Sequence, residues 1–264
     1  MNLIRADKLL MDRGIAESRT AAAELIRRGM VCIDGKPIAK PATMVFQKGL
    51  IQVQDDAPKW VSRGALKLDH ALSVFGIDCS GIIALDCGAS TGGFTECLLR
   101  RGAAKVYAVD VGYGQIHWSL RRDTRVKLLE KTNLRTVPVD VFDEPFDLAA
   151  LDLSFISLKL VLEKVRDLLA TSGEIVALVK PQFEAGKERV GRGGVIRDAE
   201  VHRQVLKDLA LWCAAHALKL LNVTASPITG PKGNREFLFY LKPGVEDMGR
   251  EYDEWIKRAV YHEA

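Results

Sequence analysis

The stretch from Ile82 to Phe94 constrains the fold of this chain more than any other stretch. It opens with four apolar residues, passes through an acid and several small residues, and ends where a helical apolar rhythm begins at Phe94. This order predicts a buried strand, a tight turn at its carboxyl end and the start of a helix. Gly88, Gly92 and Gly93 allow the turn a positive φ and a close approach to a ligand. A glycine-rich turn that binds nothing is the alternative interpretation.

The spacing around this turn indicates which kind of ligand it would hold. A dinucleotide site needs G-x-G-x-x-G for its pyrophosphate, whereas here Asp86 stands two residues before Gly88. A carboxylate at that position would repel a pyrophosphate and suits a cationic ligand. A second apolar strand ends at Asp110, twenty-four residues after Asp86, where a carboxylate is well placed for ribose hydroxyls.

Acid, glycine turn and second acid together resemble the S-adenosylmethionine site of Rossmann-like methyltransferases. The resemblance implies that S-adenosyl-L-methionine is the cofactor and that residues near the strand ends hold it. Those residues are Asp86, Gly88, Ser90, Thr91, Gly92, Gly93, Phe94, Asp110, Val111 and Asp152.

The rest of this half of the chain alternates strands with helices. We expect strands at 146–152, 174–181 and 235–241, with amphipathic helices at 158–169 and 200–216. Such alternation predicts an α/β fold, a Rossmann-like doubly wound sheet whose last strand is antiparallel to its predecessor. Ligands of such sheets bind at the carboxyl ends of the strands, where this sequence places Asp86, Asp110, Asp152 and Lys180.

Residues 1–58 form a different, smaller pattern. Two helices are expected at 3–13 and 18–28, followed by a β-hairpin around Asp34-Gly35 and a closing strand at 50–53. The first fifty residues hold nine Lys/Arg and five Asp/Glu, which accounts for the whole net charge of +4. Six of the Lys and Arg side chains predict one phosphate-binding face. The alternative is that they are only solvated surface residues. They are Arg5, Lys8, Arg19, Arg27, Arg28 and Lys36.

The order of residues in this module resembles the S4 RNA-binding domain. The likeness runs from Arg5-Ala6-Asp7-Lys8 through Ser18-Arg19 to Asp34-Gly35-Lys36, and it implies a small α+β reader of structured RNA. Two acids and a proline at 55–58 interrupt the pattern. We therefore predict two domains, an S4-like RNA-binding domain at 1–58 and a methyltransferase domain at 59–264.

Six segments of the second domain match, in order, the motifs of FtsJ-like RNA 2′-O-methyltransferases. These segments are 62–68, 86–95, 110–115, 151–157, 179–184 and 233–236. With the S4-like module, the whole chain resembles the hemolysin A (TlyA) family. The resemblance implies a catalytic tetrad of Lys67, Asp152, Lys180 and Glu236, and as substrate a ribose 2′-hydroxyl of ribosomal RNA, that of a cytidine.

The expected chemistry explains why lysines and acids would be needed together. A ribose hydroxyl is a poor nucleophile until its proton is removed or strongly polarised, and a lysine becomes a usable base when a neighbouring ammonium lowers its pKa. We expect Lys180 at the hydroxyl and Lys67 beside it, with Asp152 orienting Lys180 and Glu236 fixing the lysines. A purely structural ion pair at Lys180 is the alternative.

Other features exclude whole classes of function. The five cysteines and five histidines show no metal-binding spacing, so we expect no metal and read the cysteines as buried hydrophobic side chains. The N-terminus lacks the apolar core of a secretory signal, and no apolar run approaches the roughly 20 residues of a membrane span. These absences predict a cytoplasmic protein whose partners are ribosomal RNA or ribosomal subunits, without a membrane.

Three alternatives to a ribose methyltransferase stay open on the sequence. A membrane-lytic hemolysin is disfavoured because no spanning or strongly amphipathic basic helix is visible. A non-catalytic ribosome-binding factor would not need the intact tetrad, and a base methyltransferase would need an N-P-P-Y-like or cysteine motif that 151–155 lacks. The glycine-rich basic segment 186–195 is expected to be either a lid or a surface loop.

Overall fold

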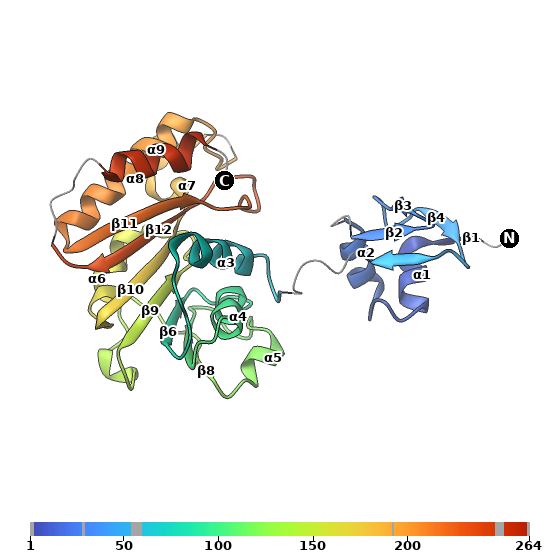
Figure 1. Cartoon of the computed structure of the whole chain (residues 1–264), viewed down its shortest axis with the longest axis horizontal. Helices are drawn as coiled ribbons and strands as arrows, with labels where there is room; N and C mark the ends of the chain where they lie inside the picture. Colours follow the sequence, from blue (N-terminus) through green and yellow to red (C-terminus); the bar gives the residue numbers. More distant parts are fainter. Residues whose placement is uncertain (1–2, 28–29, 54–59, 192, 246–250, 263–264) are drawn as a thin grey trace. The chain divides into compact units, whose positions relative to one another are not determined.

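The computed structural model describes residues 3–27, 30–53, 60–191, 193–245 and 251–262 of the chain (Figure 1). The chain divides into two compact units, residues 1–59 and 60–264, and each is described by itself. The expected domain boundary between residues 58 and 59 lies outside the described residues, as does Arg28.

In its described residues, the smaller unit contains two helices and five short strands. In chain order they are β1 (Leu3–Arg5), α1 (Ala6–Asp12), α2 (Arg19–Arg27), β2 (Val31–Ile33), β3 (Lys36–Pro37), β4 (Met44–Phe46) and β5 (Ile51–Val53). The hairpin between β2 and β3 turns at Asp34 and Gly35, which both have positive φ, as a two-residue turn requires. Leu9, Leu10 and Ile26 pack under these strands as a small core.

One expectation for the smaller unit is wrong. The helix predicted from residue 3 begins only at Ala6, because Leu3–Arg5 pairs antiparallel with Met44–Phe46 as β1 and β4. The backbone hydrogen bonds of a distant strand thus override the local helical pattern of these three residues. Ser18 caps α2, since its hydroxyl accepts the N–H of Ala21.

The described part of the larger unit is built on one seven-stranded sheet with the order β11-β12-β10-β9-β6-β7-β8. β6 to β10 are parallel, whereas β12 runs antiparallel to both β10 and β11. The strands are β6 (Ile83–Cys87), β7 (Lys105–Val109), β8 (Val126–Leu129), β9 (Phe146–Leu151), β10 (Leu169–Val179), β11 (Leu218–Ala225) and β12 (Phe237–Pro243). The predicted α/β fold class and the antiparallel last strand are confirmed.

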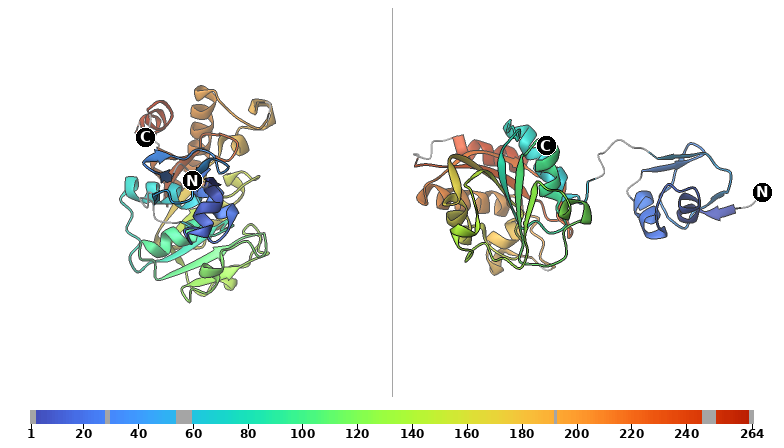
Figure 2. Two further views of the ribbon diagram at one scale, coloured as in Figure 1. Left: turned by 90° about the vertical axis from the view of Figure 1, so that its right-hand side faces the viewer. Right: turned by 90° about the horizontal axis from the view of Figure 1, so that it is seen from below.

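Helices cover both faces of this sheet (Figures 1 and 2). Because side chains alternate along a strand, Leu85 and Cys87 of β6 pack toward one layer of helices and Ala84 toward the other. The first layer contains α6 (Leu162–Arg166), α8 (Ala199–Ala215) and α9 (Glu251–Tyr261). The second contains α3 (Gly64–Phe75), α4 (Gly93–Arg100) and α5 (Trp118–Arg121).

Two further expectations differ from the structure of the larger unit. The helix predicted at 158–169 is broken into a short 3-10 turn, η2 (Leu158–Leu160), and the five-residue α6, because β10 already begins at Leu169. The edge strand β8 was not predicted, and its mixed sequence Val-Lys-Leu-Leu explains why neither period was evident. None of the described helices is long and apolar enough to cross a membrane.

Candidate active site

The site lies where the carboxyl ends of four parallel strands meet. Gly88, Asp110, Asp152 and Lys180 directly follow β6, β7, β9 and β10. The register continues past the strands, since the N–H of Asp152 donates to the carbonyl of Cys87 at 3.0 Å and the N–H of Gly88 to that of Val109 at 2.8 Å. One edge of the sheet therefore presents two acids, a lysine and the glycine turn together.

The glycines of the turn are required by the protein around them. Gly88 has a φ of +88°, and a Cβ there would lie 2.7 Å from the carbonyl oxygen of Asp152. At Gly92, with a φ of +98°, a Cβ would lie 2.2 Å from Leu120, and at Gly93 it would lie 2.2 Å from the hydroxyl of Ser62. Packing against neighbouring segments explains Gly92 and Gly93 without any ligand.

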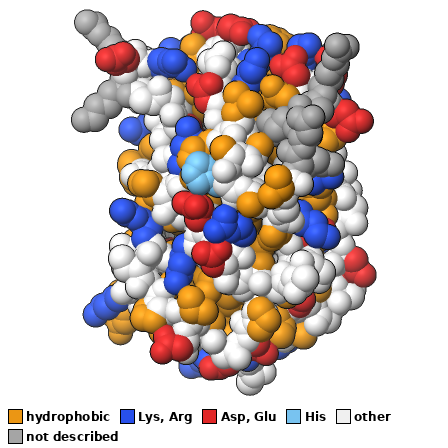
Figure 3. All heavy atoms as spheres, turned by 90° about the vertical axis from the view of Figure 1, so that its left-hand side faces the viewer, with side chains coloured by type: hydrophobic (Ala, Val, Ile, Leu, Met, Phe, Trp, Pro, Cys, Tyr) orange, Lys and Arg blue, Asp and Glu red, His pale blue; other side chains and the backbone are white. Residues whose placement is uncertain are grey.

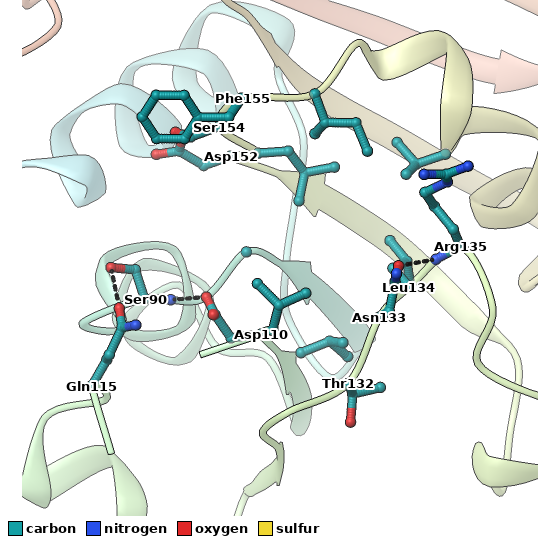
Figure 4. Close-up of a pocket in the computed structure, with 16 residues that line it drawn as sticks. Ser90, Asp110, Gln115, Thr132, Asn133, Leu134, Arg135, Asp152, Ser154 and Phe155 are labelled. Carbon is teal, nitrogen blue, oxygen red and sulfur yellow. Dashed lines mark hydrogen bonds between the residues drawn. The ribbon is translucent and has the colours of Figure 1, made fainter. Parts of the chain in front are cut away.

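A cavity of about 520 Å³ opens beside the turn (Figure 4). Among the predicted cofactor residues, those that line it are Gly88, Ser90, Asp110, Val111 and Asp152. The carboxylate of Asp110 points at the turn, where it accepts the N–H of Ser90 at 2.8 Å, and it also accepts the N–H of Gly112 in its own loop at 2.6 Å. Asp110 thus shapes the wall of the cavity as well as facing it.

Asp86 does not reach this cavity, which corrects the prediction that its carboxylate acts on the ligand directly. It is fully buried, and its side chain accepts the hydroxyl of Thr95 in α4 at 2.6 Å. Asp86 occupies the strand position that points between the sheet and α4 rather than past the strand end. The pKa of Asp86 is raised to about 7, mainly by burial and in part by the nearby carboxylate of Asp152.

The four predicted catalytic residues form two ion pairs. The ammonium of Lys67, in α3, lies 2.6 Å from Glu236, which directly precedes β12. The ammonium of Lys180 lies 2.6 Å from Asp152 and donates to the hydroxyl of Ser154 at 2.8 Å. Each lysine therefore has a carboxylate as its closest charged partner, whereas the sequence suggested that the two ammonium groups act on each other.

The two ion pairs lie between two further cavities. A small one of about 210 Å³ is lined by Lys67 and Asp152 together with Thr91, Gly93 and Phe94. Another of about 490 Å³ is lined by Lys180 and Glu236. Because each pair contributes one member to each cavity, the four side chains are brought together, and we call the 490 Å³ space the lysine cavity.

Phe155 forms part of the wall that the lysine cavity shares with the 520 Å³ cavity. It is 90% exposed and has a φ of +63°, which is rare for an aromatic residue. Its ring lies 5.1 Å from that of Phe183. A bulky apolar side chain held exposed in a strained backbone marks a place where function is expected to maintain the strain.

The segment 186–195 contributes Val190 and Gly194 to the lysine cavity. Its far end is held by Asn234, whose amide donates to the carbonyl of Gly194 at 2.8 Å and accepts the N–H of Ile196 at 3.0 Å. The segment therefore borders the site. That it acts as a lid, and not only as a surface loop, stays a prediction.

Sequence reasoning missed several side chains around these cavities. Thr132, Asn133, Leu134 and Arg135 line the 520 Å³ cavity from the loop after β8. Since β8 itself was not predicted, no signal pointed to this loop. Three more lining residues lie inside segments that match the family motifs, but the sequence did not assign them to the site. They are Gln115, Ser154 and Phe155.

The predicted RNA-binding bases of the smaller unit can be placed except for Arg28. Arg5 and Arg19 both pair with the buried carboxylate of Asp7, at 2.7 and 3.4 Å. The Arg5 guanidinium is the main cause that lowers the pKa of Asp7 to about 2. Asp7 thereby holds two guanidinium groups side by side, and the side chains of Lys8, Arg27 and Lys36 are exposed.

Among the described residues, no group of three or more His, Cys, Asp or Glu side chains lies together as a possible metal site. This leaves the expected absence of a metal as a prediction. The five cysteines are free thiols.

Comparison with known proteins gives matches over nearly the whole chain. The FtsJ-like methyltransferase family matches residues 60–243 and the S4 domain matches residues 4–45. The chain is 48% identical to the 16S/23S rRNA (cytidine-2′-O)-methyltransferase TlyA of Mycobacterium tuberculosis, over 97% of each chain. It is 44% identical to YqxC of Bacillus subtilis, provisionally named an rRNA methyltransferase, over 97% of this chain and 92% of YqxC.

Among solved structures, a protein of Streptococcus thermophilus provisionally named a hemolysin superposes with a TM-score of 0.75. It is 37% identical, and the alignment covers 98% of this chain and 96% of that one. A methyltransferase of Listeria monocytogenes, named as S-adenosylmethionine dependent, aligns at 14% identity with a TM-score of 0.52 over 69% of this chain and 99% of its own, a likeness of fold alone.

Proposed function

This chain belongs to the FtsJ-like methyltransferase family and carries an S4 domain, and we propose that it methylates a ribose 2′-hydroxyl of ribosomal RNA with S-adenosyl-L-methionine as donor. The observation that carries the proposal is the pairing of Lys67 with Glu236 and of Asp152 with Lys180 at the carboxyl edge of the sheet. A cytidine as the target is proposed from the name of the 48% identical relative.

The 520 Å³ cavity fits the proposed cofactor. Its volume lies in the range of small-molecule sites. Asp110 offers carboxylate oxygens to ribose hydroxyls, while Val111 and Leu134 provide apolar wall for an adenine. Gly88 also lines the cavity and places no side chain in it. When bound, S-adenosylmethionine supplies an electrophilic methyl group.

We propose that the target ribose enters the lysine cavity, with its hydroxyl at Lys180. Asp152 and Ser154 hold the Lys180 ammonium in one orientation. Asp152 forms an ion pair with it, and the hydroxyl of Ser154 accepts a hydrogen bond from it. The proposal assigns to Lys180 the removal of the hydroxyl proton. For this role its ammonium must first lose a proton to solvent, so that the neutral amine accepts the hydroxyl proton as the oxygen attacks. Lys67 and Glu236 would fix the opposite wall. Such positioning of reactants can supply much of the rate of an in-line transfer.

The smaller unit would dock the substrate. We propose that residues 1–58 bind RNA through Arg5, Lys8, Arg19, Arg27, Arg28 and Lys36, and that residues 59–264 perform the transfer. The charge balance supports this, because all of the net positive charge lies in the first fifty residues. Phosphate neutralisation by such a face is independent of base sequence.

Transfer of a labelled methyl group to purified ribosomal subunits tests the proposal. We expect 2′-O-methylation by the wild-type protein, and loss of it in Lys180→Ala with cofactor and RNA affinities unchanged. Lys180→Arg is the sharper variant, because a guanidinium keeps the positive charge but stays protonated. Near wild-type turnover by Lys180→Arg would eliminate the base role and leave only an electrostatic one.

Two further measurements separate the rivals. Tighter binding of NAD than of S-adenosylmethionine in calorimetry would overturn the cofactor assignment. Leakage from liposomes, without methyl transfer, would favour the lytic alternative that the name of the Streptococcus thermophilus protein suggests.

A further inference from the structure

Two aromatic side chains that follow β7, Tyr113 in the loop and Trp118 at the start of α5, are exposed without belonging to the core or to the cofactor cavity. Tyr113 is 69% exposed and Trp118 is 65% exposed. Their neighbours in sequence, Val111 and Gln115, line the 520 Å³ cavity, whereas Tyr113 and Trp118 do not. The two rings therefore lie at the outer rim of the proposed cofactor site.

Each ring has a cation over it. The ammonium of Lys131 lies 4.6 Å from the ring centre of Tyr113, and the guanidinium of Arg122 lies 5.6 Å from that of Trp118. In the part of the chain that the structure describes, neither cation forms an ion pair. By contrast, Arg121 is paired with Glu130 at 2.6 Å. Two positive charges thus stay available to a ligand, and each is next to an exposed aromatic ring.

The backbone holds this surface in place. The N–H of Lys131 donates to the carbonyl of Gly112 at 2.9 Å, and the N–H of Gly114 donates to Glu130 at 2.6 Å. The N–H of His117 donates to the carbonyl of Thr91 at 3.1 Å, which ties the loop to the glycine turn. Lys131 itself has a φ of +52°, which costs energy in a residue other than glycine.

We propose that Tyr113, Trp118, Lys131 and Arg122 form a stacking surface for unpaired nucleotides of the substrate RNA next to the methylated one. The inference rests on the proposed function, since it assumes an RNA substrate. Single-stranded nucleic acid is bound by exposed aromatic rings on which bases stack and by cations that neutralise phosphates. A protein partner is less well matched, because it would have to bury two cations that form no ion pair among the described residues.

The location supports a role near the chemistry. The segment 111–131 holds five Lys/Arg and only two Asp/Glu. On the face of the molecule shown in Figure 3, basic and acidic side chains are instead interspersed. The surface also adjoins the cavity that would hold the methyl donor. A strand crossing the rim at Tyr113 and Trp118 would hold its neighbouring ribose close to that donor.

The experiment compares the full-length wild-type chain with Tyr113→Ala/Trp118→Ala. Its probe is a short fluorescent polyuridine strand, followed by purified ribosomal RNA. Since one stacked base is worth about 1–3 kcal/mol, we expect the double variant to bind polyuridine about tenfold or more weakly. Affinity for S-adenosylmethionine should be unchanged. Tyr261→Ala, which removes an exposed tyrosine on α9, is the matched control and should bind as wild type does.

Conservative variants keep the test decisive if the alanine variant unfolds. Tyr113→Phe/Trp118→Phe retains both rings and should bind nearly as wild type, whereas Lys131→Gln/Arg122→Gln should flatten the salt dependence by about one phosphate contact per residue. Unchanged polyuridine affinity in both the alanine and the glutamine double variants would overturn the proposal. So would weaker binding of S-adenosylmethionine, which would make the surface a support of the cofactor loop.

Two outcomes separate this proposal from the proposed function. Loss of binding to intact subunits with normal binding to naked RNA would identify a protein partner and overturn the stacking surface. If the wild type transfers no methyl group to RNA but the variants still lose RNA affinity, the stacking surface stands and the proposed function fails.

Discussion

The buried ion pair between Lys67 and Glu236 allows a quantitative prediction for Glu236→Gln. The side chains are 8% and 2% exposed, and the charged atoms are 2.6 Å apart. Removing the carboxylate leaves an uncompensated ammonium inside the protein, which costs about 3–5 kcal/mol. For a domain of about 200 residues, each kcal/mol lowers the Tm by about 2–4 °C. We therefore expect the Tm of the larger unit to fall by about 6–20 °C.

Tryptophan fluorescence is the appropriate assay, because the two units need not unfold together. All four tryptophans, at positions 60, 118, 212 and 255, belong to the larger unit. Lys257→Met is the matched control. Lys257 also pairs with two carboxylates, at 2.9 and 3.0 Å, but it is 41% exposed on α9. Its loss should cost less than about 1 kcal/mol.

The double variant Lys67→Met/Glu236→Gln separates stability from catalysis. With both charges removed it should recover most of the lost Tm, since a neutral buried pair has no stranded charge. It should still fail to transfer methyl groups. Equal Tm losses in Glu236→Gln and Lys257→Met would refute the reasoning about burial. A double variant with wild-type turnover would show that the pair has no part in the reaction.

Three other perturbations give distinct outcomes. Asp110→Ala should weaken S-adenosylmethionine about tenfold or more in calorimetry, because a charged hydrogen-bond acceptor is lost; unchanged affinity would remove Asp110 from the cofactor site. Lys8→Ala/Lys36→Ala should lower RNA affinity and flatten its salt dependence. Unlike loss of Arg5 and Arg19, this change leaves the buried carboxylate of Asp7 with its ion-pair partners. An unaltered salt slope would place the docking face elsewhere. In the folded protein the pKa of Asp86 is about 7, above its ordinary value of 3.8, so a protonated Asp86 favours folding. Its contribution to the free energy of unfolding therefore falls as the pH rises from about 4 to 7, by up to about 4 kcal/mol. Asp86→Asn should remove that slope from fluorescence-monitored melts, and identical pH profiles would contradict it.

The sequence predicted the centre of the sheet well because apolar strands there are followed by chemically distinctive residues. β6, β9 and β10 read as buried runs that end near Asp86, Asp152 and Lys180, and the structure places the residues after these strands at one edge. The edge strand β8 has no such run. Consequently the loop that carries Asn133 and Arg135 into the cofactor cavity could not be predicted.

Other misses depend on contacts that no local pattern encodes. The alternation of side chains along β6 could be predicted from the sequence. The contact between Asp86 and Thr95 of α4, which goes with complete burial of the carboxylate, could not. Which carboxylate each lysine takes as its partner depends on how α3 packs against the sheet. The pairing of Leu3–Arg5 with Met44–Phe46 likewise joins residues about forty positions apart, so the start of α1 could not be located from its own periodicity.

The direction of β12 explains how Glu236 joins residues that follow parallel strands. In β10 the residue that precedes Lys180 is Val179, and it pairs with Phe237, the first residue of β12. Because β12 is antiparallel, its amino end lies at the edge where the carboxyl ends of β9 and β10 lie. A parallel β12 of the same seven residues would carry Glu236 to the opposite edge, about 20 Å away at roughly 3.3 Å per residue. Lys67 would then lose its ion-pair partner. The reversal of one strand is therefore what allows two ion pairs, rather than one, to border the lysine cavity.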